Sequence, residues 1–439
     1  MSKHFPYKSA DQLAADCRER GLDLSVTEEI SLLTEPVAVA ERRLDNPLVI
    51  QPMEGCDGTA DGRPSELTHR RYQRFAAGGA GLIWFEATAI TRNGRGNPRQ
   101  LWLNPHTLDS FSDLVASTRS QATGNPILLL QLTHSGRYSR PVGVRAPVFA
   151  FRDPQLDQRT NVTREHVPIS DQELTELQQQ FVQAAVLAKA AGFDGVDIKA
   201  CHRYLVSELL AGHTRPGGYG GSLEGRTRFL RETVAAVRQA VGEDFILATR
   251  LNVWDAAPWP YGWGVTEGSP EQPELSEARW LAADLSERGV SIINVTAGNP
   301  YVLPYIGRPF DKPVIGGALP AEHPLTGVER LLGFAAEIQS EVPEVAVVGT
   351  GYSWLRQYFP QVAAAELARG RSRLVGLGRM AFACPDFPLQ LAAGELEPGN
   401  LCTACSMCTQ IMRDGGRTGC VVRDSDVYLS EYRAGHAKA

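Results

Sequence analysis

The chain has 439 residues, of which 43% are hydrophobic and 21% are charged, and its formal net charge is -6. This composition is typical of globular proteins, and the length provides ample chain for a buried core. There is no basic stripe and no apolar run of roughly 20 residues, which argues against nucleic-acid binding and against a membrane span. Residues 1–10 lack the apolar core of a signal peptide, so we expect a cytoplasmic protein.

Residues 1–35 are polar, with a short helical pattern at 11–20, and predict an N-terminal arm. After the arm, strand patterns and helical patterns alternate along the chain. The expected strands lie at residues 48–51, 81–86, 127–132, 195–199, 246–251, 292–295, 345–348 and 374–377. The expected helices lie at 67–77, 171–191, 224–240, 277–288, 325–339 and 354–369.

Strands that alternate with helices imply βαβ units and a parallel sheet, so the chain belongs to the α/β class. Eight such units favour a closed TIM (β/α)8 barrel over an open doubly wound sheet. We assign the barrel to residues 36–395 and a Cys-rich metal-binding extension to 396–439. Three long connections, at 135–170, 252–274 and 298–324, follow strands and are expected to form binding loops rather than decorative insertions.

Polar side chains stand where the fourth strand ends. Lys199, His202 and Tyr204 follow the apolar strand within six residues. The carboxyl end of the strands is the face on which parallel barrels build their active sites. These three residues are therefore the candidate catalytic group.

Glycines follow the last two strands. Gly349 and Gly351 follow the seventh strand, and Gly378 and Arg379 follow the eighth. Backbone N–H groups in such turns can face an anion, and an arginine can bind it with two hydrogen bonds. Tight turns also need glycine for conformational reasons alone, but the shared position of these two turns predicts a phosphate site.

Residues 213–229, His-Thr-Arg-Pro-Gly-Gly-Tyr-Gly-Gly-Ser-Leu-Glu-Gly-Arg-Thr-Arg-Phe, resemble the signature that follows the fourth strand in the Old Yellow Enzyme family of NADH:flavin oxidoreductases. The resemblance covers about residues 36–395. It implies a TIM barrel that binds FMN noncovalently. Gly351 and Arg379 fall where that family holds the cofactor.

The same resemblance implies further FMN contacts. Gln131 would face the pyrimidine edge of the flavin. Arg250 would lie near N1 and O2 and stabilise the negative charge of the reduced ring. Pro52, Met53 and Ala87 would line the ring, partly through their backbone. Ordinary barrel packing is the alternative for any one of these residues.

Glu54 stands at a position that tunes the flavin in the family, and a carboxylate there disfavours an anionic reduced flavin unless a cation neutralises it. Lys199 is the obvious cation.

The Lys199, His202 and Tyr204 segment resembles the family's substrate-binding segment, with two departures. Position 199 is usually His, and position 203 is usually Gly but here is Arg203. Hydride addition to an activated alkene builds negative charge on a carbonyl oxygen, which Lys199 and His202 would stabilise as donors. Tyr204 would be the acid that protonates the α-carbon. The alternative is that Lys199 forms a purely structural ion pair with Glu54.

Four of the eight cysteines, Cys402, Cys405, Cys408 and Cys420, crowd the C-terminal end of the chain. Such clustering in a cytosolic protein indicates a metal site rather than disulfides. The segment resembles the [4Fe–4S] segment of bacterial dienoyl-CoA reductase and trimethylamine dehydrogenase, which carry the same barrel. We expect these cysteines to hold a [4Fe–4S] cluster. A structural zinc ion or no metal are the alternatives.

No Gly-x-Gly-x-x-Gly follows a strand, so we expect no internal NAD(P)H or FAD domain. Electrons would come directly from NAD(P)H or from a separate electron-transfer protein.

The leading hypothesis is an FMN-dependent reductase of an activated C=C bond in a small molecule. An oxidative amine dehydrogenase or demethylase that passes electrons outward through the cluster is the main alternative. A redox-neutral isomerase or lyase and a non-catalytic flavin- or metal-binding subunit also stay open, as does a homo-oligomeric state.

Overall fold

In the computed structural model, which describes residues 5–269 and 271–436, parallel strands form a closed barrel in the order β10-β3-β4-β5-β6-β7-β8-β9. All eight strand positions predicted from the sequence are confirmed. The barrel strands are β3 (Leu48–Ile50), β4 (Leu82–Ala89), β5 (Ile127–Thr133), β6 (Gly195–Ile198), β7 (Ile246–Asn252), β8 (Val290–Thr296), β9 (Ala346–Gly349) and β10 (Leu374–Leu377).

Side chains on each strand alternate between two cores. Val49 belongs to the cluster inside the barrel, whereas its neighbours Leu48 and Ile50 pack in the cluster between the strands and the outer helices. An antiparallel hairpin, β1 (Val37–Val39) and β2 (Arg42–Leu44), precedes the barrel. Val39 and Leu44 of this hairpin join the inner cluster. The strands are therefore buried on both faces, as their continuous apolar runs predict.

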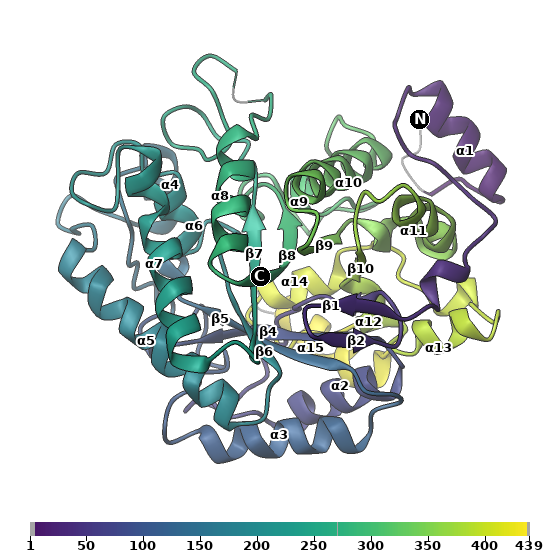
Figure 1. Cartoon of the computed structure of the whole chain (residues 1–439), viewed down its shortest axis with the longest axis horizontal. Coiled ribbons are helices and arrows are strands. Elements are labelled where there is room, and N and C mark those ends of the chain that lie inside the picture. Colours follow the sequence, from purple (N-terminus) through teal and green to yellow (C-terminus); the bar gives the residue numbers. More distant parts are fainter. Residues whose placement is uncertain (1–4, 270, 437–439) are drawn as a thin grey trace.

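Helices surround the strands, as Figure 1 shows. Two of them, α2 and α5, begin with a serine capping box, at Ser65 and Ser170. The helices are α1 (Ala10–Glu19), α2 (Glu66–Ala77), α3 (Leu108–Ser120), α4 (Pro154–Thr160), α5 (Asp171–Ala190), α6 (Leu205–Leu210), α7 (Leu223–Val241), α8 (Ser276–Glu287), α9 (Pro304–Gly307), α10 (Pro324–Glu341), α11 (Phe359–Ala368), α12 (Arg379–Ala383), α13 (Phe387–Ala392), α14 (Met407–Arg413) and α15 (Ser425–His436).

The helix predicted at residues 354–369 is wrong in its first half. The segment Tyr352–Tyr358 is a 3₁₀ helix, η3, in which Arg356 adopts a positive φ of 50°. Helix α11 begins only at Phe359, with Pro360 in its first turn. Proline is favoured there because the first turn needs no backbone N–H donor.

The C-terminal extension packs on the barrel through α2. Arg70 and Arg74 of α2 both form ion pairs with Asp424, at 2.7 and 2.6 Å. The backbone N–H of Thr418 donates to the carbonyl of Gly55 in the segment that follows β3, at 2.6 Å. These contacts bring α14 to the carboxyl ends of the barrel strands.

Across residues 5–269 and 271–436, none of the helices combines the length and the apolar character that crossing a membrane requires.

Candidate active site

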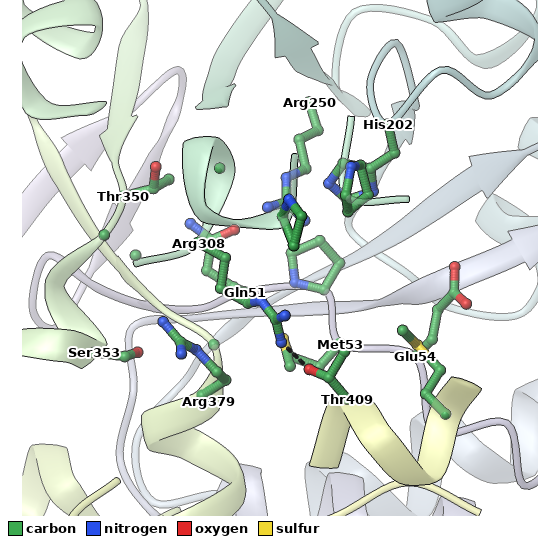
Figure 2. Close-up of a pocket in the computed structure, with 18 of the residues that line it drawn as sticks. Gln51, Met53, Glu54, His202, Arg250, Arg308, Thr350, Ser353, Arg379 and Thr409 are labelled. Atoms are coloured by element: carbon green, nitrogen blue, oxygen red, sulfur yellow. Dashed lines mark hydrogen bonds between the residues drawn. The ribbon is translucent and has the colours of Figure 1, made fainter. Parts of the chain in front are cut away.

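One cavity lies at the carboxyl ends of the strands, and the barrel, the segment 299–313 and α14 all contribute to its wall. Figure 2 shows Thr350, Ser353 and Arg379 at one side of it and Glu54 and His202 at the other. Ten of the residues predicted from the sequence line this cavity. They are Pro52, Met53, Glu54, Lys199, His202, Tyr204, Arg250, Gly351, Gly378 and Arg379.

Lys199 and Tyr204 share the carboxylate of Glu54. The Lys199 Nζ lies 3.5 Å from Glu54 Oε1 and 4.1 Å from the centre of the Tyr204 ring. The Tyr204 hydroxyl donates to the same Oε1 at 3.3 Å and lies 3.1 Å from the hydroxyl of Tyr301. The expected ion pair between Lys199 and Glu54 is thus present, and it fits both a neutralising role and the purely structural alternative. Burial, together with Glu54 and Tyr301, raises the pKa of Tyr204 well above its usual range, so the phenol keeps its proton at neutral pH.

His202 and Arg203 form a sharp turn after β6, with φ values of 66° and 58°. A side chain in this left-handed region costs about 1 kcal/mol or more relative to glycine. Arg203 is held there by ion pairs to Asp255 at 2.9 Å and Asp153 at 3.2 Å, all buried. Arg203 therefore anchors two loops rather than contacting the cavity. Burial, with Arg250 and Lys199 nearby, lowers the pKa of His202 well below its usual range, so its imidazole is neutral.

Asp197, in the middle of β6, organises the barrel beneath the cavity. Its Oδ2 accepts from Gln131 Nε2 at 2.6 Å and from Trp84 Nε1 at 3.0 Å. Its Oδ1 accepts from the backbone N–H of Arg250 at 2.8 Å. Burial raises the pKa of Asp197 to about 6. Sequence reasoning did not identify this role, although a carboxylate inside an apolar strand was a visible signal.

Three predicted cofactor residues do not line the cavity. Gln131 is buried against Asp197, and Ala87 is buried in β4, where its carbonyl accepts from Gln100 Nε2 at 2.9 Å. Gly349 shapes its turn, because a Cβ there would lie 2.9 Å from the Tyr352 hydroxyl. Their contacts with a cofactor stay predictions.

The two glycine turns and Arg379 form one end of the cavity. Gly351 has a φ of 105°, which favours glycine, and a Cβ on Gly378 would lie 2.8 Å from Met53 Sδ. Arg379 is buried, and its Nη2 donates to the carbonyl of Pro309 at 2.7 Å. Among the residues that the structure describes, its buried Nη1 finds no hydrogen-bond partner. A buried donor that faces a cradle of glycines fits a phosphate group.

Gln51, the residue that follows β3, was not among the predicted site residues. Its Oε1 accepts from Asn294 Nδ2 at 2.7 Å, and its buried Nε2 has no hydrogen-bond partner within residues 5–269 and 271–436. A Cβ on Gly376 would lie 1.9 Å from that Nε2, so only glycine leaves room for the amide. Arg250 Nε is likewise buried without a partner. These free donors fit the polar edge of a flavin, whose ring presents carbonyl oxygens and ring nitrogens.

The segment that carries Met53 and Glu54 is fixed by a buried ion network behind it. Arg71 of α2 pairs with Asp57 at 2.5 Å and also with Glu86 of β4, and all three side chains are buried. The N–H of Gly55 donates to Glu86 Oε2 at 2.9 Å. This network holds the segment against the barrel.

The four predicted metal ligands are half-buried free thiols. Burial raises the pKa of Cys402 and of Cys420, and the charge of Cys408 raises both pKa values further. Backbone N–H groups of Ala404 and Arg423 donate to the sulfurs of Cys402 and Cys420, each at 3.4 Å. Such bonds are common around iron–sulfur sites. In the described part of the chain, however, no three His, Cys, Asp or Glu side chains are arranged to hold a metal ion. The metal site stays a prediction.

Comparison with known proteins finds that residues 32–265 match the model of the "NADH:flavin oxidoreductase / NADH oxidase family". An NADPH dehydrogenase of Bacillus pumilus is 31% identical over 74% of this chain and 91% of its own length. A metal reductase of Desulforamulus reducens is 28% identical over 86% of this chain, but the chain spans only about half (51%) of that protein. Among solved structures, a 2-naphthoyl-CoA reductase complex superposes with a TM-score of 0.72 at 20% identity, over 92% of this chain and 58% of the other.

Proposed function

Because the chain belongs to the NADH:flavin oxidoreductase / NADH oxidase family, we propose that it is an FMN-dependent enzyme that reduces an activated C=C bond of a small molecule. One observation carries this proposal. Lys199, His202 and Tyr204 face the same cavity as Arg250 and the glycine turns. Donors for a developing oxyanion thus share one space with donors for a flavin and its phosphate.

FMN, when bound, supplies a hydride from its reduced ring. Arg379 and the turn at Gly378 would hold the phosphate, and Gln51 and Arg250 would contact the ring. The arginine charge favours the negative charge of the reduced state. Met53 and Pro52 exclude water from the side of the cavity that they line.

The substrate carbonyl would accept hydrogen bonds from Lys199 Nζ and from the N–H of the neutral His202 imidazole. These donors stabilise the oxygen as its negative charge grows. Tyr204 would give its proton to the α-carbon, so that one hydride and one proton saturate the double bond. The Tyr301 hydroxyl, 3.1 Å from that of Tyr204 and partly exposed, would relay a proton from solvent back to Tyr204.

The amine-oxidation alternative is favoured by one feature, the Glu54 carboxylate beside the Tyr204 and Tyr301 rings. A carboxylate and aromatic faces bind protonated amines. Against it, Lys199 already occupies that position, and Arg250, Arg308, Arg379 and Arg413 line the same cavity. This surplus of positive charge disfavours a cationic substrate.

The test is anaerobic reaction of the purified holoenzyme. We expect NADPH or NADH to bleach the flavin absorption, and an enone such as cyclohexenone to restore it. Bleaching by trimethylamine without NAD(P)H would contradict the reductase proposal and support amine oxidation. Protein that purifies without FMN and does not bind it would contradict both.

We also propose that Cys402, Cys405, Cys408 and Cys420 hold a [4Fe–4S] cluster. The two N–H to sulfur bonds and the two-residue spacings support it. Analysis of iron, sulfide and zinc tests this separately from catalysis. About four irons per chain are expected, whereas stoichiometric zinc or no metal would contradict the cluster. The proposal that an electron-transfer protein supplies the electrons requires the cluster. Direct reduction of FMN by NAD(P)H does not require it.

A further inference from the structure

The seam between the barrel and the extension contains two arginines that the mechanism does not use. Arg308 follows α9 on the segment 299–313, and Arg413 ends α14. Arg308 Nη1 hydrogen-bonds to Thr409 Oγ1 of α14, the contact drawn as a dashed line in Figure 2. Arg413 Nη2 donates back to the carbonyl of Pro300 at 3.2 Å. Both side chains line the cavity.

The charges that line the cavity do not balance. Five cationic side chains face one carboxylate, Glu54, which gives a formal charge of 5 − 1 = +4. Lys199 and Glu54 neutralise each other as an ion pair. The remaining four cations are Arg250, Arg308, Arg379 and Arg413. Within the residues described, none of these four arginines forms an ion pair with a carboxylate.

Under the proposed function, FMN accounts for only two of these arginines. Its phosphate would pair with Arg379, and its reduced ring would pair with Arg250. Arg308 and Arg413 have no flavin group as partner, and the anionic groups that act on Arg308 are the thiols of Cys408 and Cys402. Burial, and then repulsion from Arg379, lower the pKa of Arg308, and the charges of Cys408 and Cys402 only partly oppose this shift. A desolvated cation among other cations is unfavourable unless an anion joins it.

The surroundings also fit an organic anion. Pro300, Pro304 and Met412 supply an apolar lining beside the two guanidinium groups. The Thr409 hydroxyl, which accepts from Arg308, keeps its own proton available for an incoming oxygen. Arginines and a hydroxyl are donors that carboxylates and phosphates accept well.

We propose that Arg308, Thr409 and Arg413 form an anion-binding subsite, and that the carboxylate or phosphate group of the substrate occupies it. The inference rests on the proposed function, because the substrate is the activated alkene reduced in this cavity. It specifies that substrate as an anion whose charged group lies apart from the carbonyl held by Lys199 and His202. It also makes α14 of the Cys-rich extension part of the substrate site.

Monomethyl fumarate and dimethyl fumarate test the subsite, because both carry an ester-activated double bond and only the first carries a carboxylate. The second ester makes the diester the more reactive alkene, so a preference for the monoester has to come from binding of its carboxylate. We expect the holoenzyme to show kcat/KM at least about tenfold higher for the monoester, as charge-assisted hydrogen bonds imply. In Arg308→Gln that ratio should fall about tenfold or more. Arg417→Gln is the matched control, because Arg417 lies on the same extension, pairs with Glu431 and does not line the cavity. Its ratio should equal that of the wild type.

An unchanged ratio in Arg308→Gln would overturn the subsite. So would a selective loss of FMN affinity with normal riboflavin binding, because Arg308 would then serve the cofactor phosphate. If the wild type reduces neither ester, a binding measurement tests the subsite instead, and the proposed function fails only if cyclohexenone also leaves the flavin reduced. Monomethyl succinate, which has no double bond, is titrated while the flavin absorption is followed. A dissociation constant about tenfold weaker in Arg308→Gln supports the subsite, and equal constants in both proteins overturn it.

Discussion

The two walls of the cavity are built in different ways. The barrel wall consists of strand ends whose backbones bond to the next strand, as Lys199 N does to the carbonyl of Leu132 at 3.1 Å. The extension wall consists of α14 and Thr418. The extension is held to the barrel by individual polar contacts and by Leu401 and Ala404, which pack in the main core. Among the polar contacts are the Asp424 ion pairs and the bond from Ile315 N to Gln410 Oε1 at 2.8 Å. The comparison teaches that a sheet fixes its strand ends through regular backbone hydrogen bonds, whereas a docked segment is held by individual contacts of its side chains and loops.

The largest effect should come from breaking the buried network behind the barrel wall. Arg71→Met leaves Asp57 and Glu86 buried without their cation, which costs about 3–5 kcal/mol. Urea unfolding measures this loss. Arg70→Met, one residue earlier on α2, removes a partly exposed arginine that pairs with the extension and should cost about 1 kcal/mol or less. Equal losses in the two variants would contradict the distinction between the walls.

Removal of the proposed acid should slow catalysis without affecting the fold. We expect Tyr204→Phe to reduce the rate of alkene reduction about 100-fold or more, while NADPH still reduces the flavin at close to the wild-type rate. Because the pKa of Tyr204 is raised, the wild-type rate should not fall between pH 7 and 9 through loss of this proton. Stopped-flow absorbance measures both half-reactions.

Tyr138→Phe is the control, because Tyr138 stacks on Tyr301 at 3.9 Å and its hydroxyl bonds to Asn299 rather than Glu54. A similar loss of rate in this variant would argue for a packing role of the tyrosines.

The phosphate end of the barrel wall should determine cofactor affinity. Arg379→Ala removes a charge-assisted contact and should weaken FMN binding about tenfold or more. Riboflavin, which has no phosphate, should bind both proteins alike. Fluorescence titration of the apoprotein with each flavin measures the two constants. Arg373→Ala is the control and should change neither constant. Arg373 is partly exposed, precedes the same strand and donates to the carbonyl of Ala38. If Arg379→Ala weakened the binding of FMN and of riboflavin equally, the assignment of Arg379 to the phosphate site would be wrong.

The smallest effect should come from loosening the extension. Asp424→Asn should increase hydrogen exchange in α15 at pH 7 and leave the barrel strands protected. In the wild type, burial opposes ionisation of Asp424, but Arg70 and Arg74 outweigh it and lower its pKa. Ionised Asp424 therefore stabilises the folded extension fully above the unfolded pKa of about 3.9. This stabilisation is lost as the pH falls through the lowered pKa of the folded state. Wild-type protection of α15 should thus be constant between pH 8 and 5. Faster exchange in the barrel strands of the variant would show that the two walls unfold together.

Much of the barrel wall could be predicted from the sequence. Apolar runs placed all eight strands, because strands buried on both faces need continuous apolar residues. The residues after those runs, such as Lys199 and Arg379, share one cavity because parallel strands bring their carboxyl ends to one edge. The family signature added the expectation of FMN, which the family match supports.

Tertiary structure alone decided which side chains meet across the cavity. Gln51 and Asn294 are 243 residues apart, and Arg308 and Thr409 are 101 apart, yet each pair is hydrogen-bonded. It also decided that Gln131 bonds to Asp197 and that α14 closes the cavity. Local sequence patterns encode burial and periodicity, so they determine elements and their edges. Contacts between distant segments depend on how the elements pack, and for that reason only the folded chain revealed the arginine-lined seam.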